Sequence, residues 1–263
     1  MLLAKSCSTR NNIKNGTLKV GTLFEYRETE IQQIADKEEG YLWFNLKFDG
    51  DVKIPAVYFN TFNRVLRVGK TPGIEFPGAC QAQFIVMDIV NQDDDSITLR
   101  NSHIRVERQA LNSFIFCVSL VRKMADCINI FPNYDDYWYI RDHNAIDFGR
   151  AVGRLILEKI KSEHSKGNFI LPPSTNTNNL RILVTPDKIT YTPRDIHFNN
   201  TNIPTLGELI QNMQSMAFMK PPVPFAKEKE YRFLYTIISG DTIIPPIQKH
   251  IIIDSDQLQK FII

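Results

Sequence analysis

Short apolar runs, rich in aromatic and β-branched residues, recur along this chain and constrain its fold more than any other feature. Side chains of this kind favour extended strands, and the Gly, Pro, Asn and Asp residues between the runs favour turns. The clearest runs are Tyr41–Phe48, Phe84–Val90, Ile97–Val106, Phe114–Leu120 and Arg232–Ile238. The chain is therefore expected to build its core from β-sheets.

Two segments have the spacing of amphipathic helices instead. Residues Asp147–His164 repeat apolar side chains such as Phe148, Val152 and Ile156 at helical intervals. A second helix is expected over Thr205–Phe218, before a proline-rich stretch that cannot continue it. Strands that dominate over two helices predict the α+β class, with an antiparallel-rich sheet system.

Four segments carry weaker patterns. Thr17–Arg27 alternates and is expected to form one strand, or two strands broken at Gly21. Val52–Phe62 is expected to be a further extended segment. Ile31–Gly40, which is charged, and Ile196–Ile203, which is rich in asparagine, are expected to be loops.

The composition is that of an ordinary globular protein, with 43% hydrophobic and 23% charged residues and a net charge of +2. This balance neither requires nor excludes a nucleic-acid partner, because a basic patch can lie within a neutral total. The 263 residues suffice for one large domain. A single domain spanning residues 1–263 is therefore expected.

The sequence also carries expectations about the compartment. No apolar stretch reaches the roughly 18 to 20 residues of a transmembrane helix, and Met1–Cys7 lacks the apolar region of a signal peptide. The four cysteines are widely spaced, without the Cys-x-x-Cys pair of zinc and redox sites. These features predict a cytoplasmic protein without membrane association.

The common catalytic motifs are absent from the sequence. It has no Gly-rich phosphate loop, no Gly-x-Ser-x-Gly elbow and no His-Glu-x-x-His. The five histidines are scattered, and Asp93–Asp95 is expected to be a solvated turn, because consecutive side chains on a tight turn diverge.

Two carboxylates, Glu228 and Glu230, stand two residues apart where the apolar run Arg232–Ile238 begins. Residues at this spacing point to the same face of an extended chain. Paired carboxylates can act as acid and base, or stabilise a developing positive charge. The ordinary alternative is a solvated strand edge guarded by charge.

Two further residues precede this pair in a fixed order. Arg27 follows an aromatic segment and can grip a phosphate with two parallel hydrogen bonds, or else pair with Glu25 or Glu28. Ser119 ends the run Phe116–Ser119 and can orient a substrate, or else cap a turn.

In this order, Arg27, Ser119 and Glu228-x-Glu230 resemble the ADP-ribosyltransferases of the Arg–Ser–Glu class. The chain departs from that family at Cys117, where a serine is common. The resemblance implies a split, antiparallel-rich β-sheet core with a few helices.

The segments around Arg27, around Asp36 and Glu39, and over Glu228–Arg232 look more narrowly like bacterial relatives encoded in toxin–antitoxin and phage-defence loci. One such group modifies mRNA and is held inactive by an antitoxin. The resemblance therefore implies a toxin acting in phage defence, with an antitoxin protein as a possible partner.

The resemblance also implies roles in the cleavage of NAD⁺, which passes through an oxocarbenium-like cation as glycoside hydrolysis does. Glu230 would stabilise that cation, Ser119 would orient Glu230 and the ribose, and Glu228 would deprotonate or orient the acceptor. Arg27 would hold a phosphate. An aromatic wall for nicotinamide would come from Tyr26 or Tyr137. Neighbouring candidates for this wall are Tyr134, Trp138 and Tyr139.

The acceptor implied by the resemblance is a macromolecule, with RNA or DNA favoured and protein as the alternative. Cations that could steer a nucleic-acid backbone are Lys220, Lys227, Lys229 and Arg232. Aromatic residues that could stack on bases are Phe218, Phe225 and Tyr231.

Two other functions compete. A non-enzymatic nucleic-acid- or partner-binding module of a defence complex would use the same strands, and it predicts that Arg27, Ser119 and Glu230 lie far apart. A metal-dependent endonuclease would instead use carboxylates, and its candidates are Asp36, Glu39 and Glu228.

Overall fold

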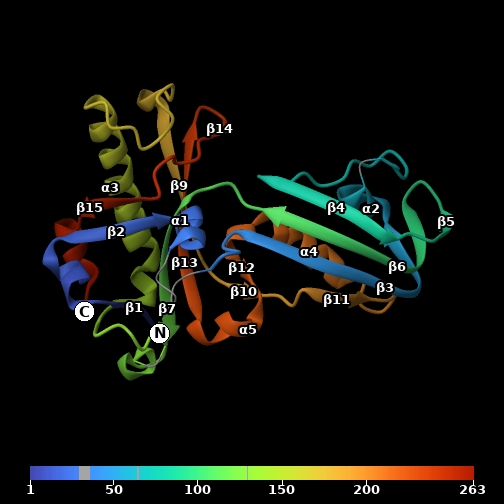
Figure 1. Cartoon of the computed structure of the whole chain (residues 1–263), viewed down its shortest axis with the longest axis horizontal. Helices are drawn as coiled ribbons and strands as arrows, with labels where there is room; N and C mark the ends of the chain where they lie inside the picture. Colours follow the sequence, from blue (N-terminus) through green and yellow to red (C-terminus); the bar gives the residue numbers. More distant parts are fainter. Residues whose placement is uncertain (30–35, 64, 129) are drawn as a thin grey trace. The chain divides into compact units, whose positions relative to one another are not determined.

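The computed structural model describes residues 1–29, 36–63, 65–128 and 130–263, and the chain divides into two compact units (Figure 1). Unit 1 consists of Met1–Glu39, Asn112–Ile189 and Val223–Ile263, and unit 2 of Gly40–Leu111 and Thr190–Pro222. The interpretation of residues 1–263 as one domain stays a prediction, and each unit is described by itself.

Unit 1 is built on an eight-stranded sheet in which every described pairing is antiparallel. Its strands are β1 (Leu2–Cys7), β2 (Thr17–Thr22), β7 (Phe114–Val121), β8 (Asp136–Arg141), β9 (Leu180–Lys188), β13 (Glu230–Ser239), β14 (Thr242–Ile243) and β15 (His250–Asp254). The helices are α1 (Leu23–Glu28) and α3 (Ala145–Ser165), and α5 (Pro222–Phe225) begins at the last residue of unit 2.

The sheet of unit 1 divides at β7. One edge of β7 pairs with β13, and the other edge pairs with two different strands. Ser119 and its two successors pair with β1, whereas Phe114 and Ile115 pair with β2. Strand β8 continues the sheet beyond β1, and β15 continues it beyond β2. The sheet is therefore split on this side, opposite the middle of β7.

Helix α3 packs on one face of this sheet. Its buried side chains, including Phe148, Val152 and Ile156, share an apolar cluster with Phe116 and Phe233 of the central strands. Two glycines of α3 allow the close approach. A Cβ atom on Gly149 would lie 2.8 Å from the Phe233 ring, and one on Gly153 would lie 2.8 Å from Val184.

Unit 2 is built on a five-stranded sheet of order β11-β3-β6-β4, with β5 also paired to β6. Its elements are β3 (Tyr41–Pro55), α2 (Ala56–Phe62), β4 (Ala79–Val86), β5 (Ile89–Gln92), β6 (Ser96–Gln109), β11 (Asp195–Phe198) and α4 (Pro204–Gln214). A separate parallel pair joins β10 (Thr190–Tyr191) to β12 (Met219–Lys220). Helices α2 and α4 contribute Phe59, Leu209 and Ile210 to the core of this unit.

The α+β class and the antiparallel-rich sheets are confirmed, as are the other strands expected from the clearest apolar runs and the helix expected over Asp147–His164. The run Phe84–Val90 is the exception, because β4 ends at Val86 and β5 begins at Ile89. Ile31–Gly40, expected to be a loop, falls partly outside the described residues. No described helix combines the length and the hydropathy that crossing a bilayer requires.

Three local expectations are wrong. Within Thr17–Arg27 the strand ends at Thr22, where the hydroxyl accepts a hydrogen bond from the Glu25 amide and caps α1. Within Val52–Phe62 the strand ends at Pro55 and α2 follows, with proline at the cap position. The expected loop Ile196–Ile203 contributes to β11, which pairs in parallel with β3.

Candidate functional site

Ser119 and Glu230 stand directly opposite each other in the antiparallel register of β7 and β13. Side chains at opposite positions of such a pair lie on the same face of the sheet. Both residues are buried. Two positions separated by 111 residues in sequence are therefore adjacent at the end of β13, as the catalytic interpretation requires.

A buried arginine lies next to this pair. Arg232 follows Glu230 at the i+2 position of β13 and is 1% exposed. Its Nε donates to Glu230 Oε1 at 2.6 Å, while Nη1 and Nη2 donate to the two carboxylate oxygens of Glu39, each at 2.6 Å. Burial alone would lower the pKa of Arg232, but Glu230 and Glu39 raise it well above its ordinary value. The three side chains form one buried ionic cluster.

The backbone places Glu39 for this contact. The Asp36 amide donates to the Tyr26 carbonyl at the end of α1, and the Glu39 amide donates to the Asp36 carbonyl. Asp36 is itself buried, and its carboxylate accepts from the Glu38 amide at 3.0 Å. The turn that carries Glu39 is therefore anchored to α1.

Arg27 reaches the same turn from α1. Its Nε donates to the Glu39 carbonyl, and its guanidinium lies over the Phe24 ring at 4.2 Å. Its Nη2 is buried and has no hydrogen-bond partner among the described residues. Burial lowers the pKa of Arg27, against the nearby Glu39 and Asp36. Arg27 therefore has a donor that an anionic oxygen could satisfy, although it lies on a helix and not at the end of a strand.

Glu228 does not share the strand of Glu230. It ends a single 3₁₀ turn over Ala226–Glu228, and Lys229 follows in the left-handed conformation with φ 47°. Strand β13 begins only at Glu230. The alternation that was expected to put both carboxylates on one face therefore does not apply, because the backbone turns between them. Glu228 is half-buried, whereas Glu230 is buried.

A cavity of about 240 Å³ lies at the split in the sheet. Residues of β1, β2 and α1 line it together with Phe116 of β7. Lys5 reaches into the split from β1, donates to the Cys117 carbonyl at 2.9 Å and lies 5.0 Å from the Phe116 ring. Burial lowers the pKa of Lys5. Ser6, also in the lining, has a buried hydroxyl without a partner among the described residues.

Three aromatic side chains that the sequence singled out line this cavity, namely Tyr26, Tyr134 and Trp138. Burial raises the pKa of Tyr26 well above its ordinary value, with Cys117, Glu25, Glu230 and Glu39 adding to the effect.

Tyr137 is not among the residues that line the cavity. Its hydroxyl donates to the Ile128 and Tyr134 carbonyls, and its ring packs against a small apolar cluster that includes Ala4 and Val121. The Tyr139 hydroxyl donates to the Met124 carbonyl. Successive residues of β8 alternate between faces, so Trp138 faces the cavity side and its two neighbours do not.

Several residues expected to meet nucleic acid are buried. Arg232 is enclosed with its carboxylates, and Lys220 and Phe218 belong to the interior of unit 2. Lys227 and Lys229 are exposed beside Glu228. The sequence suggested one group of cations because these residues are close along the chain. In the structure, Arg232 and Lys220 are buried, whereas Lys227 and Lys229 are exposed.

The described residues contain no group of three or more His, Cys, Asp or Glu side chains that could hold a metal ion. Of the carboxylates proposed for an endonuclease, Glu39 has both oxygens bonded to Arg232. Cys117 stands opposite Arg232 in register, and burial, followed by Glu230, raises the pKa of its thiol well above the ordinary value. This thiol is therefore held in its neutral form.

Sequence reasoning missed two contributions to the site. Arg232 was interpreted as a surface cation, although the i, i+2 spacing of Glu230 and Arg232 indicates that they share a face of the strand. Lys5 had no signal, because its position depends on where the sheet divides.

No family model, curated protein or solved structure matches this chain.

Proposed function

We propose that this chain is an NAD⁺-dependent ADP-ribosyltransferase that transfers ADP-ribose to a macromolecular acceptor, with nucleic acid, mRNA in particular, as the favoured class. The observation that carries the proposal is the pairing of Ser119 with Glu230 across β7 and β13. Arg27 joins this pair through Glu39 and Arg232. A chain of contacts therefore links the three residues that the sequence singled out, and this link supports the proposal.

The residues at the split offer contacts that suit a dinucleotide. Inside the cavity, Lys5 and the unpartnered hydroxyl of Ser6 can meet anionic or hydroxyl oxygens. The unpartnered donor of Arg27 could meet a further oxygen, although Arg27, Ser119 and Glu230 are not among the residues that line the cavity. Trp138 and Tyr26 supply aromatic surface for a nicotinamide ring. The cavity is smaller than the ~300–1,000 Å³ typical of ligand sites, which suits one end of NAD⁺ rather than the whole molecule. The resemblance implies a split, antiparallel-rich sheet, and the division of the sheet beside β7 supports the proposal in this respect.

Bound NAD⁺ would supply an ADP-ribosyl group whose bond to nicotinamide breaks with the electron pair leaving on nicotinamide, so that positive charge develops at the ribose carbon. Glu230 would face that charge with its carboxylate. Ser119 would hold the ribose and the carboxylate in position. Arg27 would hold a phosphate. Glu228, outside the strand, would take the proton of the attacking acceptor group.

Arg232 has a positioning role in this proposal. It contacts both oxygens of Glu230, at 2.6 and 3.2 Å, and fixes the plane of the carboxylate. Its second pair of contacts, to Glu39, fixes the guanidinium in turn. A carboxylate held in this way is already oriented, so little free energy is needed to reorient it when positive charge develops beside it.

A nucleic-acid acceptor is proposed because exposed Lys227 and Lys229 flank Glu228 and can attract a phosphate backbone. A toxin role in phage defence, with an antitoxin partner, follows from the resemblance to bacterial relatives. The binding-module alternative requires Arg27, Ser119 and Glu230 to lie far apart, and the chain of contacts between them favours the enzyme instead.

The test is to incubate the protein with labelled NAD⁺ and, separately, with RNA, DNA and protein from the same cells. Wild type is expected to release nicotinamide and label one class of acceptor. Glu230→Gln is expected to lower the rate by about 100-fold or more, because the charge facing the ribose is lost. Glu208→Gln, at an exposed glutamate of unit 2, is the matched control and is expected to leave the rate unchanged.

Thermal unfolding of both variants shows whether loss of activity reflects loss of fold. Absence of nicotinamide release and of label transfer by folded wild type would contradict the proposal. Full activity in Glu230→Gln would remove the assignment of the site. Lys227→Gln and Lys229→Gln remove exposed lysines that have no catalytic role in this proposal. Both variants are expected to raise the KM for RNA with little change in kcat.

A further inference from the structure

Strand β4 forms one edge of the sheet in unit 2. Among the described residues it pairs with β6 alone, so the backbone groups on its other side have no strand to bond to. The regular part of the ladder runs from Ala79 to Phe84, and the register shifts before Val86. An unpaired strand edge is a ready template for another strand.

Most exposed edges carry charge, proline or short length that prevents such pairing. The opposite edge of the same sheet follows this rule, because β11 is four residues long and presents Asp195 and His197 to solvent. Strand β4 is eight residues long and has no charged residue or proline from Ala79 to Met87. The two edges of one sheet therefore differ in the features that control association.

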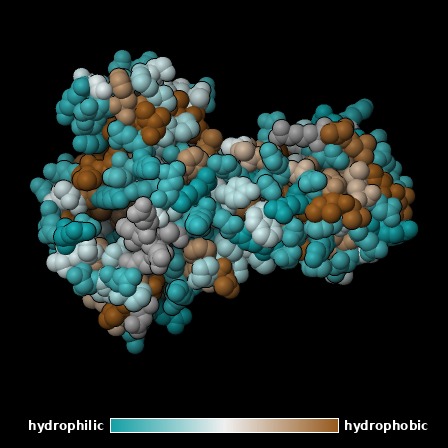
Figure 2. All heavy atoms as spheres, viewed as in Figure 1, coloured by the Kyte–Doolittle hydropathy of each residue, from teal (hydrophilic) through white to brown (hydrophobic). Residues whose placement is uncertain are grey.

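Exposed apolar side chains continue this edge. Ile85, Val86, Met87, Ile89 and Val90 are between 36% and 52% exposed, which is unusual for a run of large apolar residues. Figure 2 shows hydrophobic surface over the part of unit 2 where Figure 1 labels β5. Contiguous apolar surface of this kind marks interaction sites in soluble proteins.

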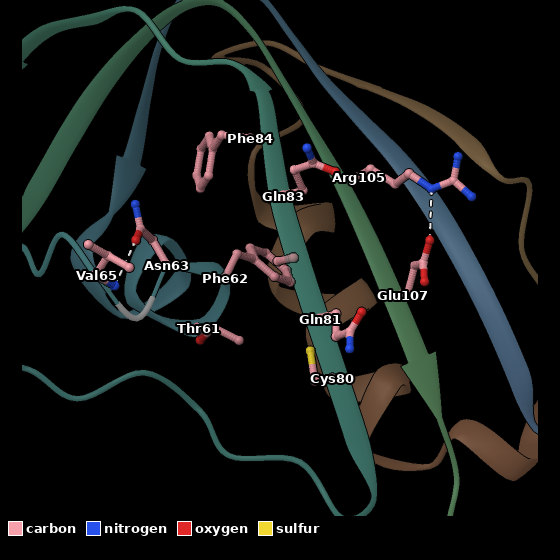
Figure 3. Close-up of a pocket in the computed structure, with 11 residues that line it drawn as sticks. Thr61, Phe62, Asn63, Val65, Cys80, Gln81, Gln83, Phe84, Arg105 and Glu107 are labelled. Atoms are coloured by element: carbon pink, nitrogen blue, oxygen red, sulfur yellow. Dashed lines mark hydrogen bonds and ion pairs between the residues drawn. The ribbon is translucent and has the colours of Figure 1, made fainter.

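A groove of about 460 Å³ runs along β4 (Figure 3). Phe62 and Phe84 lie on one side of the strand, and Gln81 and Gln83 lie on the other, together with Arg105 and Glu107 of β6. The groove therefore exposes side chains on both faces of β4. The floor on the core side is apolar and the opposite side is polar, as in the interior of a continuous sheet.

We propose that this edge binds a second copy of the chain, with the two β4 strands antiparallel across a two-fold axis at Ala82. When two copies of one strand pair in antiparallel fashion, the apolar faces of both copies must lie on the same side of the joined sheet. This happens only if the two-fold axis passes beside a residue, and not beside a peptide bond, because opposite residues then belong to the same face. Ala82 is the midpoint of Ala79–Ile85, so this axis pairs a stretch without charged residues against itself.

This register fixes the neighbours across the axis. Gln81 of each copy stands opposite Gln83 of the other, on the polar face, where their amides can exchange hydrogen bonds. Cys80 stands opposite Phe84 on the apolar face. No pair brings like charges together, and the apolar groove of each copy is covered by the strand of the other. The proposal is independent of the enzymatic function.

The first measurement is the mass of the wild-type chain in solution by light scattering after gel filtration, at concentrations from about 1 µM to 1 mM. The mass is expected to rise with concentration from 30.4 kDa towards twice that value. A chain that stays monomeric over the whole range overturns the proposal, and would leave the β4 edge to an extended segment of another protein.

Charge variants then test the register. Gln81→Lys with Gln83→Lys places like charges opposite each other at both symmetry-related pairs, and is expected to weaken the dimer about tenfold or more. Gln81→Lys with Gln83→Glu places opposite charges there, and also sets each new charge beside an opposite one on β6, since Gln81 pairs with Glu107 and Gln83 with Arg105. This second variant is expected to dimerise at least as well as wild type.

The matched control is Gln211→Lys with Gln214→Lys, which adds the same charge at two exposed positions of α4 in the same unit. It is expected to leave the dimer unchanged. Thermal unfolding of each variant as a dilute monomer excludes loss of fold as the cause. The proposed register is overturned if the control pair on α4 weakens the dimer as much as Gln81→Lys with Gln83→Lys does. It is also overturned if Gln81→Lys with Gln83→Lys and Gln81→Lys with Gln83→Glu dimerise equally well.

Discussion

Among the described residues, each unit encloses one fully buried arginine, and the two are held by different chemistry. Arg232 of unit 1 is bonded to the carboxylates of Glu39 and Glu230. Arg108 of unit 2, which is 0% exposed, donates to three backbone carbonyls, those of Pro77, Ala79 and Met213. The same side chain therefore neutralises charge in one unit and joins backbone segments in the other.

The pKa values of the two arginines move in opposite directions for this reason. Burial lowers the pKa of Arg108, and the nearby Cys80 offsets only part of this effect. For Arg232 the two glutamates outweigh burial and raise the pKa well above its ordinary value. A buried charge that lies among other charges is typical of a functional site, whereas one held by carbonyls is typical of a structural connection.

The largest effect is expected from Arg232→Met. Removing the guanidinium breaks the buried ion pairs with Glu39 and Glu230, and breaking a buried pair by removing one partner typically costs about 3–5 kcal/mol. This is a large part of the ~5–15 kcal/mol by which a native domain is stable. Urea unfolding at pH 7, followed by circular dichroism, measures the loss.

A compensating variant checks the cause. Glu39→Gln and Glu230→Gln added to Arg232→Met remove the uncompensated charges, so the triple variant is expected to be more stable than Arg232→Met alone. A triple variant that is less stable than the single one would show that packing, and not charge, explains the loss.

A smaller effect is expected from Arg108→Met. This substitution leaves no charge behind, and among the three carbonyls that lose their donor only that of Met213 is in a fully buried contact, so the expected cost is about 1–3 kcal/mol. The same urea experiment compares it with Arg232→Met. If Arg108→Met costs as much as Arg232→Met, the distinction between the two kinds of buried arginine fails.

The smallest effect is expected from Arg100→Met, which removes an exposed arginine of β6. Its guanidinium contacts both oxygens of Asp51 at 2.6 and 2.9 Å, but solvent screens exposed pairs strongly. At pH 7 the unfolding midpoint is expected to stay within experimental scatter of wild type, and any difference should shrink further as salt is added.

The same pair has a defined pH dependence. The hydrogen bonds from Arg100 lower the pKa of Asp51 from its ordinary 3.8. Any stabilisation is therefore present above about pH 3.8 and is lost as the pH falls through the lower value of the folded state. A difference between wild type and Arg100→Met that grows towards low pH would contradict this sign.

Much of the fold could be predicted from periodicity. Strands β6, β7 and β13 and helix α3 coincide with apolar patterns because each buries a continuous face. Helix α1 could not be predicted in this way. Its sequence alternates like a strand, and the helix depends on the Thr22 hydroxyl that caps it.

The candidate site could be predicted in part. The sequence singled out Arg27, Ser119 and Glu230, which the structure joins through contacts. It could not place Arg232, because a charged side chain is ordinarily exposed and only the turn that carries Glu39 encloses it. Glu228 was misplaced because a left-handed residue follows it and starts the strand one position later.

The sequence by itself determined the α+β class, the central strands and the residue types from which a site could be made, because these depend on local periodicity and side-chain chemistry. The tertiary structure alone decided which of those residues meet. Strand register places Ser119 opposite Glu230, and the division of the sheet beside β7 opens a cavity around Lys5. Register and sheet order depend on contacts between segments far apart in the chain, and local periodicity contains no information about those contacts.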